Sequence, residues 1–148
     1  MAFDIVECQT MNDDQRNGFV GLVLVSHSAA IADGLAELVA QVAGPHVPIV
    51  TAGGGPDGSF GTDGGRVLEA LQRASAGAGA VVLMDLGSAV LSVRAALLEL
   101  EPEAAGRIDV ADAPLVEGAI AAGVTASTGA GRDAVLAAAR EARSVDKL

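Results

Sequence analysis

Two side chains that can act together in chemistry, His27 and Asp85, lie where apolar runs of the sequence end. The runs, residues 20–25 and 80–84, have the length and the β-branched content of buried strands. In a parallel sheet the carboxyl ends of the strands meet at one edge, and functional groups are presented there. If both strands run parallel in one sheet, a histidine and a carboxylate lie at the same edge.

A carboxylate that accepts the Nδ1 proton of an imidazole sets the tautomer of the ring and leaves Nε2 as a nucleophile. This is the functional interpretation of His27 and Asp85. The structural alternative is that His27 satisfies backbone carbonyls in the core, while Asp85 caps a helix or binds loop amides. The neighbours Ser26 and Ser28 are small and polar, which leaves the His27 ring open to solvent and favours the functional interpretation.

Further polar groups around this edge could bind a phosphoryl group. Gly87 and Ser88 open the helical pattern after Asp85, and the free amides and positive dipole end of a helix bind anions. Hydroxyl groups and loop amides can position such an anion and stabilise its charge. The candidate hydroxyl groups are those of Ser26, Ser28, Thr62 and Ser88.

The second histidine, His46, lies between Gly44-Pro45 and Val47-Pro48. This context predicts a surface turn near a helix C-terminus, where a positive charge is favourable, and a structural role.

Several other kinds of site are excluded. The glycines at residues 53–55 are not followed by the Lys-Ser or Lys-Thr of a nucleotide-binding loop, and no dinucleotide fingerprint follows the first strand. No hydrolase serine motif is present. With two differently placed histidines and one cysteine, Cys8, we expect no metal site.

Composition restricts the class of protein and its partners. The chain has 148 residues, of which 51% are hydrophobic, and carries a net charge of −10. This acidity and the absence of Trp and Tyr argue against a nucleic-acid partner; the charge suits either a basic protein partner or simple solubility. No apolar run approaches the roughly 18 residues of a membrane span, and we expect a cytoplasmic protein without a membrane partner.

Strand and helix patterns alternate after a polar segment, residues 1–18, which we predict to be a disordered N-terminal tail. The predicted strands cover residues 20–25, 47–51, 80–84 and 107–111. The predicted helices cover residues 31–42, a segment from a cap at Thr62 or Asp63 to the glycines at 77–79, and residues 88–100, 114–120 and 130–143. Pro48 places the second strand at an edge.

In the helix at 88–100, the apolar candidates for the core are Leu91, Leu97, Leu98 and Leu100. The glycine-rich loop at residues 52–63 is long enough to suggest function or mobility. The βαβαβαβα order predicts one α/β domain, residues 19–148: a three-layer α/β/α sandwich around a mainly parallel sheet of four to five strands.

Four stretches carry a family resemblance: LVSHS at 24–28, GTD at 61–63, VLMDLGSA at 82–89 and APLVEG at 113–118. In order and spacing they resemble the phosphotransferase subunits of phosphoenolpyruvate (PEP)-dependent dihydroxyacetone kinases. These subunits belong to the mannose-type EIIA superfamily of the bacterial phosphotransferase system (PTS). The resemblance covers residues 19 to about 143 and implies the EIIA fold and a homodimer.

The resemblance also implies the reaction. His27 corresponds to the histidine that the carrier protein HPr phosphorylates at Nε2, and Asp85 to the aspartate that supports its ring. The phosphoryl group then passes to ADP on a nucleotide-binding kinase subunit, which phosphorylates dihydroxyacetone held on a substrate-binding subunit. No cofactor or metal is expected on this phosphocarrier subunit, and its donor is expected to be a separate protein.

Two other functions stay open at this point. The chain could be the EIIA component of a mannose-family sugar transporter, which works with a permease and a IIB protein. It could also be a regulatory module that senses its own phosphorylation state.

Overall fold

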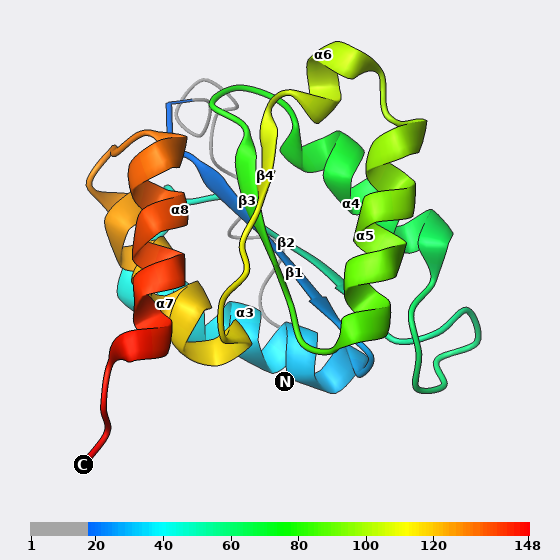
Figure 1. Cartoon of the computed structure of the whole chain (residues 1–148), viewed down its shortest axis with the longest axis horizontal. Coiled ribbons are helices and arrows are strands. Elements are labelled where there is room, and N and C mark those ends of the chain that lie inside the picture. Colours follow the sequence, from blue (N-terminus) through cyan, green and yellow to red (C-terminus); the bar gives the residue numbers. More distant parts are fainter. Residues whose placement is uncertain (1–17) are drawn as a thin grey trace.

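The computed structural model describes residues 18–148 (Figure 1). The predicted tail, residues 1–18, lies outside the described residues except for Gly18. Four strands form one sheet in the order β2-β1-β3-β4, and every neighbouring pair is parallel. The strands are β1 (Gly21–Ser26), β2 (Ile49–Gly53), β3 (Ala80–Met84) and β4 (Ile108–Val110). The parallel sheet predicted from the alternating pattern is therefore confirmed, with four strands.

Helices cover both faces of this sheet. One face is covered by α3 (Ala29–Ala43), α7 (Leu115–Ser127) and α8 (Arg132–Glu141), and the other by α4 (Gly64–Ala74) and α5 (Gly87–Glu99). Two short elements, α6 (Pro102–Ala105) and the 3-10 turn η1 (Ala142–Ser144), complete the described part of the chain. Figure 1 shows the resulting three layers, which confirm the α/β/α sandwich.

The central strands are apolar on both faces because both faces are covered. In β1, Leu22 and Leu24 pack toward α3 and α7, whereas Val23 and Val25 pack toward α4 and α5. All four side chains are fully buried. This is why β1 and β3 appear in the sequence as continuous apolar runs.

Most predicted elements agree with the structure to within two residues. Strand β3 has the predicted bounds, β1 begins and ends one residue later, and β2 lies two residues later at the edge that Pro48 indicated. Asp63 is the N-cap of α4, accepting a hydrogen bond from the amide of Gly65 at 2.9 Å. Helix α7 extends to Ser127, beyond its predicted end at residue 120.

The predicted core face of α5 is wrong for two leucines. Leu91 and Leu98 are 67% and 88% exposed. The buried residues of this helix are Ala89, Val93 and Ala96. Because α5 is apolar on nearly all sides, its hydrophobic pattern could not identify the side that faces the sheet.

A close backbone approach beside His27 requires a glycine at position 53. A Cβ atom there would lie 2.7 Å from Ala29 Cα and 2.9 Å from Ala32 Cβ, at the start of α3. Gly53→Ala should therefore displace the N-terminus of α3 and lower the free energy of unfolding by about 1–3 kcal/mol. Denaturant unfolding followed by far-UV circular dichroism measures this change.

Gly34, an exposed residue in the middle of α3, is the matched control. A Cβ atom there meets nothing within 4 Å, so Gly34→Ala should stabilise the protein by about 0.5–1 kcal/mol through higher helix propensity. Equal stability changes of the same sign at both positions would show that β2 and α3 are not in close contact.

Candidate functional site

The site lies at the carboxyl edge of the sheet, where the central strands β1 and β3 end. Val25 and Met84 are register partners, so the residues that follow them lie side by side. The amide of Asp85 still donates to the Val25 carbonyl at 3.2 Å. The expectation that the two strands run parallel in one sheet is confirmed, and the structure adds that they are direct neighbours, which brings His27 to Asp85.

His27 and Asp85 form a two-point contact. Nδ1 of His27 lies 2.8 Å from Oδ1 of Asp85, and the backbone amide of His27 donates to Oδ2 at 3.0 Å. The His27 and Asp85 side chains are only 22% and 17% exposed. Because a carboxylate accepts but does not donate, Nδ1 carries the proton in this contact.

Two further donors reach the Asp85 carboxylate. The Ser26 hydroxyl donates to Oδ2 at 2.8 Å, and the Leu86 amide donates to Oδ1 at 2.7 Å. Burial raises the pKa of Asp85, but the hydrogen bonds from His27, Ser26 and Leu86 outweigh it and hold the pKa below its ordinary value. Asp85 is therefore ionised at neutral pH and keeps the Nδ1 tautomer of His27 in place.

The other ring nitrogen of His27 faces helix α5. Nε2 contacts the hydroxyl of Ser88, the second residue of that helix. Since Nδ1 is protonated, Nε2 carries a lone pair and the Ser88 hydroxyl donates to it. The atom with nucleophilic character is thus directed at Ser88 and at the start of α5.

The N-terminus of α5 has the properties of an anion site. Its N-cap is Leu86, and no side chain of the described residues caps it. The amides of the first two helical residues, Gly87 and Ser88, have no partner within the helix because of their position. Together with the helix dipole, they favour a negatively charged group near Nε2 of His27.

The remaining predicted site residues hold the elements around His27. Ser26 is fully buried, and its Oγ also accepts from the Ser28 amide at 3.1 Å. Ser28 is the N-cap of α3, and its Oγ accepts from the Ile31 amide at 3.3 Å. These contacts give Ser26 and Ser28 roles in positioning Asp85 and α3.

Thr62 reaches the site through a serine that the sequence analysis missed. Ser92 Oγ donates to the Ser88 carbonyl at 3.2 Å, so Thr62 Oγ1, 2.7 Å away, donates to Ser92 Oγ. The Gly61 amide donates to the His27 carbonyl at 2.9 Å. The glycine-rich loop is thus joined to both β1 and α5. The helical spacing of Ser92, one turn after Ser88, is the signal that could have identified it.

His46 lies at the opposite edge of the sheet, before β2 begins. It is exposed, as predicted, and its ring stacks on Phe19 with centroids 5.4 Å apart and an interplanar angle of 18°. The two histidines of the chain therefore occupy opposite ends of the parallel strands.

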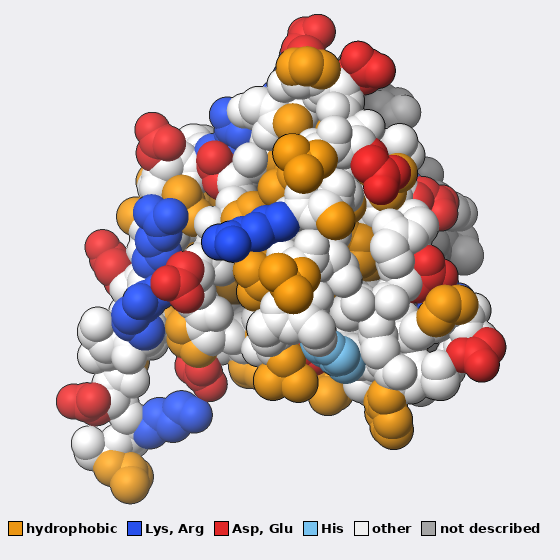
Figure 2. All heavy atoms as spheres, turned by 45° about the vertical axis from the view of Figure 1, so that its right-hand side comes forward, with side chains coloured by type: hydrophobic (Ala, Val, Ile, Leu, Met, Phe, Trp, Pro, Cys, Tyr) orange, Lys and Arg blue, Asp and Glu red, His pale blue; other side chains and the backbone are white. Residues whose placement is uncertain are grey.

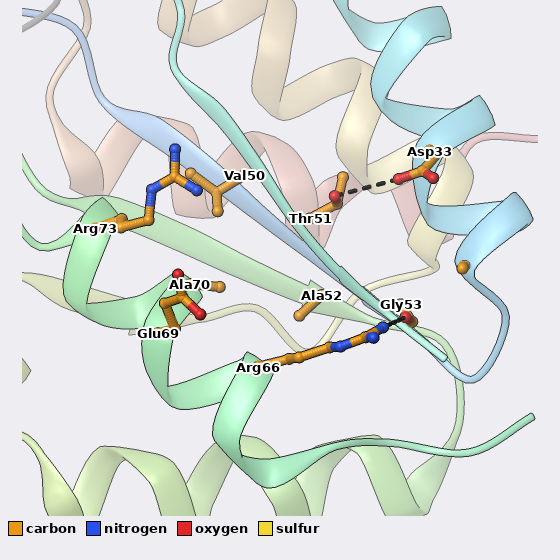
Figure 3. Close-up of a pocket in the computed structure, with 10 residues that line it drawn as sticks. Asp33, Val50, Thr51, Ala52, Gly53, Arg66, Glu69, Ala70 and Arg73 are labelled. Carbon is orange, nitrogen blue, oxygen red and sulfur yellow. Dashed lines mark hydrogen bonds between the residues drawn. The ribbon is translucent and has the colours of Figure 1, made fainter. Parts of the chain in front are cut away.

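A cleft of about 320 Å³ lies beside β2 and is separate from the His27 site. Figure 3 shows Arg66 extending from α4 to the Gly53 carbonyl, and Asp33 of α3 accepting a hydrogen bond from Thr51.

Residues 18–148 contain no group of three or more His, Cys, Asp or Glu side chains that could hold a metal ion. Within the same residues, no helix is long and apolar enough to cross a membrane.

Removing the Ser26 hydroxyl should raise the pKa of Asp85 and destabilise the fold. The pKa of Asp85 is lower in the folded protein than in the unfolded chain, where it is near 3.8. The ionised carboxylate therefore stabilises the fold at a pH above this unfolded-state pKa, and the stabilisation is lost as the pH falls through the folded-state pKa. Ser26→Ala should therefore lower the free energy of unfolding at pH 7 by about 1.5–3 kcal/mol. Carboxyl-carbon NMR titration of Asp85 and denaturant unfolding measure the two effects.

Ser59→Ala is the control for this prediction. Its hydroxyl donates to Asp57 at 2.6 Å in an exposed loop, so solvent can replace the bond. We expect no measurable change in stability at Ser59. An Asp85 pKa that is the same in Ser26→Ala as in the wild type would contradict the positioning role.

Comparisons with known proteins agree on the family. The model of the EIIA-man family, described as the PTS system fructose IIA component, matches residues 21–136. A curated relative from Providencia stuartii, the "PEP-dependent dihydroxyacetone kinase, phosphoryl donor subunit DhaM", is 44% identical over 83% of this chain. The match spans only 26% of that relative's length. The chain thus spans about a quarter of the length of this longer relative.

A shorter relative and a solved structure match over nearly their whole length. The "PEP-dependent dihydroxyacetone kinase 2, phosphoryl donor subunit DhaM" of Listeria innocua is 35% identical, with 79% of this chain and 94% of the relative covered. The crystal structure of "unknown function protein EF1359" superimposes with a TM-score of 0.72 and 35% identity, over 82% of this chain and 93% of the other. The chain therefore belongs to the EIIA-man family, and relatives named as DhaM subunits match it over most of its length.

Proposed function

We propose that the chain is the phosphocarrier subunit of a PEP-dependent dihydroxyacetone kinase. It accepts a phosphoryl group from phosphorylated HPr on Nε2 of His27 and passes it to ADP on the nucleotide-binding kinase subunit. The observation that carries the proposal is the orientation of His27: Nδ1 is 2.8 Å from the Asp85 carboxylate, and Nε2 faces Ser88. The names of the DhaM relatives support the choice of downstream reaction.

The geometry supports both halves of the transfer. The Nε2 lone pair attacks the phosphorus atom, a P–N bond forms, and the P–N bond to the donor histidine breaks. The Nδ1 proton stays in place, so the phosphorylated ring carries a positive charge that the Asp85 carboxylate balances. In the second step a β-phosphate oxygen of ADP attacks phosphorus, the bond to Nε2 breaks, and the lone pair returns to the ring.

The start of α5 supplies the charge stabilisation. When the phosphoryl group arrives, the Ser88 hydroxyl leaves Nε2 and donates to a phosphoryl oxygen. The amides of Gly87 and Ser88 lie at the positive end of the same helix and suit the other oxygens. Ser26, Ser28 and Thr62 act in this proposal by holding Asp85, α3 and the loop in position.

Apolar side chains beside the site suit contact with a protein partner. Leu86, next to Asp85, is 63% exposed, and Phe60, in the loop that is joined to His27, is 87% exposed. Since the His27 side chain is mostly buried, a phosphorylated donor protein must contact these apolar residues to bring its phosphorus atom within bonding distance of Nε2.

The proposal includes HPr as donor, the ADP-binding and substrate-binding kinase subunits as downstream partners, a homodimer, and a cytoplasmic location. It requires no metal or cofactor on this subunit, since both steps use only the histidine, its carboxylate and hydrogen-bond donors.

A labelling and chase experiment tests this function. The protein is phosphorylated with radiolabelled PEP, enzyme I and HPr, separated from them, and mixed with the ADP-bearing kinase subunit. We expect the label to be lost from the protein and to appear in dihydroxyacetone phosphate once the substrate-binding subunit is added. Label that moves instead to a transporter IIB protein would favour a sugar-transport role, and label that stays on His27 would favour a regulatory module.

A further inference from the structure

The glycine-rich loop before α4 presents one large apolar side chain to solvent. Phe60 is 87% exposed, and Leu86, the N-cap of α5, is 63% exposed. Figure 2 shows hydrophobic side chains on both sides of a histidine at the lower edge of the molecule, where the strands end. An aromatic side chain in this position gains free energy when the surface of a partner buries it.

The end of this loop is held at two consecutive residues. The Gly61 amide donates to the His27 carbonyl at 2.9 Å, and Thr62 Oγ1 donates to Ser92 Oγ at 2.7 Å. Glycine loses the most backbone entropy when it is ordered, so a loop rich in glycine is costly to hold in one position. Phe60 directly precedes both contacts, which fix where its side chain leaves the loop.

Ser92 contributes more to the loop than to its own helix. Its hydroxyl donates to the Ser88 carbonyl one turn earlier, at 3.2 Å, a kind of bond that slightly disfavours a helix. Thr62 and Ser92 are both half-buried, which shields the bond between them from water. Because the Ser88 hydroxyl faces Nε2 of His27, this bond joins the loop to the helical turn that suits the phosphoryl group.

The loop is also negatively charged. Asp57 lies three residues before Phe60, and hydrogen bonds from the side chain of Ser59 and from backbone amides hold the pKa of Asp57 below its ordinary value. The net charge of −10 adds to this field. A protein surface that fits here is therefore apolar at its centre and basic at its rim.

We infer that the Thr62–Ser92 hydrogen bond is a latch that holds Phe60 as a docking contact for the phosphoryl donor protein. The inference rests on the proposed function and adds the residues that set the KM for the donor. Thr62 and Ser92 are positioning residues. An apolar contact that is already fixed before the donor arrives reduces the freedom that docking must remove, and it helps to align the donor's phosphorus atom with Nε2 of His27.

Two phosphoryl donors separate docking from chemistry. Phosphorylated HPr must dock, whereas phosphoramidate is a small donor whose P–N bond breaks as the bond to Nε2 forms, with release of ammonia. Phe60→Ala should raise the KM for phosphorylated HPr about tenfold or more. Thr62→Val and Ser92→Ala should each raise it about three- to tenfold. In all three variants, the rate with HPr should fall relative to the rate with phosphoramidate.

The two hydroxyl groups of the latch should act as one unit. Either substitution removes the same bond, so Thr62→Val/Ser92→Ala should raise the KM no more than the larger single effect. Thr62→Ser keeps the donor hydroxyl and should restore a KM near that of the wild type. In a protein that already carries Phe60→Ala, Thr62→Val should have almost no further effect, because the contact that the latch positions is gone.

Two matched controls lie away from the loop. Leu98 is 88% exposed at the far end of α5, and Leu98→Ala removes a similar apolar surface. The Ser127 hydroxyl donates to the Val124 carbonyl of its own helix at 2.6 Å, and Ser127→Ala removes a bond like that of Ser92. Both variants should keep the wild-type KM. Circular dichroism verifies the folding of every variant.

Three results would each overturn the inference: an unchanged KM in Phe60→Ala, additive effects of the two latch substitutions, or an equal loss of rate with both donors. The wild type shows whether the proposed function has failed as well. A wild type that phosphoramidate labels and phosphorylated HPr does not would reject the phosphocarrier role together with the inference. A wild type that HPr labels, with an unchanged Phe60→Ala, would reject the inference alone.

Discussion

His27→Ala should abolish phosphorylation of the protein by PEP, enzyme I and HPr, whereas His46→Ala should be labelled like the wild type. Nε2 of His27 is the only imidazole nitrogen of the described residues that lies at the site and has its partner ring nitrogen held by a carboxylate. His46 stacks on Phe19 at the other edge of the sheet. Removing the nucleophile leaves no route to the covalent intermediate, so the expected loss exceeds about a thousandfold.

The two histidine variants control for each other because the chain has only two histidines. Phosphorylation of each variant is measured as incorporation of radiolabel from PEP at matched protein concentrations. Circular dichroism verifies that each variant is folded. Since the protein has no Trp or Tyr, concentration must come from amino-acid analysis or peptide-bond absorbance. Equal labelling of both variants would mean that His27 is not the acceptor.

Asp85→Asn should slow phosphoryl transfer by about a thousandfold while preserving the shape of the side chain. Donors reach both oxygens of the Asp85 carboxylate: the His27 amide and ring, the Ser26 hydroxyl and the Leu86 amide. Whichever way an asparagine is turned, its NH₂ group meets one of these donors. If NH₂ faces Nδ1, the ring proton moves to Nε2 and the nucleophilic lone pair is lost.

Rapid-quench measurement of single-turnover transfer from phosphorylated HPr gives the rate, and ring-nitrogen chemical shifts of His27 report the tautomer. Asp63→Asn is the control, because Asp63 caps α4 and asparagine caps helices equally well. We expect wild-type rates for Asp63→Asn. A rate for Asp85→Asn within a few-fold of the wild type would contradict the role of Asp85 in orienting His27.

The strands and the central pair of the site could be predicted because short-range patterns determine them. The apolar runs that became β1 and β3 are buried on both faces, and such runs are visible in the sequence without knowledge of the partners. Once these strands are parallel neighbours, the positions of His27 and Asp85 follow from the register alone. The edge position of β2 also followed from a local property, the missing amide of Pro48.

Other features depend on contacts between distant segments and could not be read from local patterns. The fully buried Ser26 points its hydroxyl at Asp85, 59 residues away, and the sequence does not show which face of the strand end that side chain takes. Ser92 joins Thr62 to α5 across 30 residues. The inner face of α5 was predicted wrongly because leucines occur on both sides of this helix. Leu91 and Leu98 are exposed, since no other segment of the described residues packs against them.

The most direct test of the account is the position of the phosphoryl group on the ring. The protein, labelled with ¹⁵N in histidine, is phosphorylated with PEP, enzyme I and HPr, and proton–nitrogen correlation and ³¹P NMR spectra are recorded. The account predicts a phosphoryl group bonded to Nε2 of His27, with the proton of Nδ1 retained. A phosphoryl group on Nδ1 of His27, a phosphorylated His46, or an unchanged spectrum of both rings would contradict it.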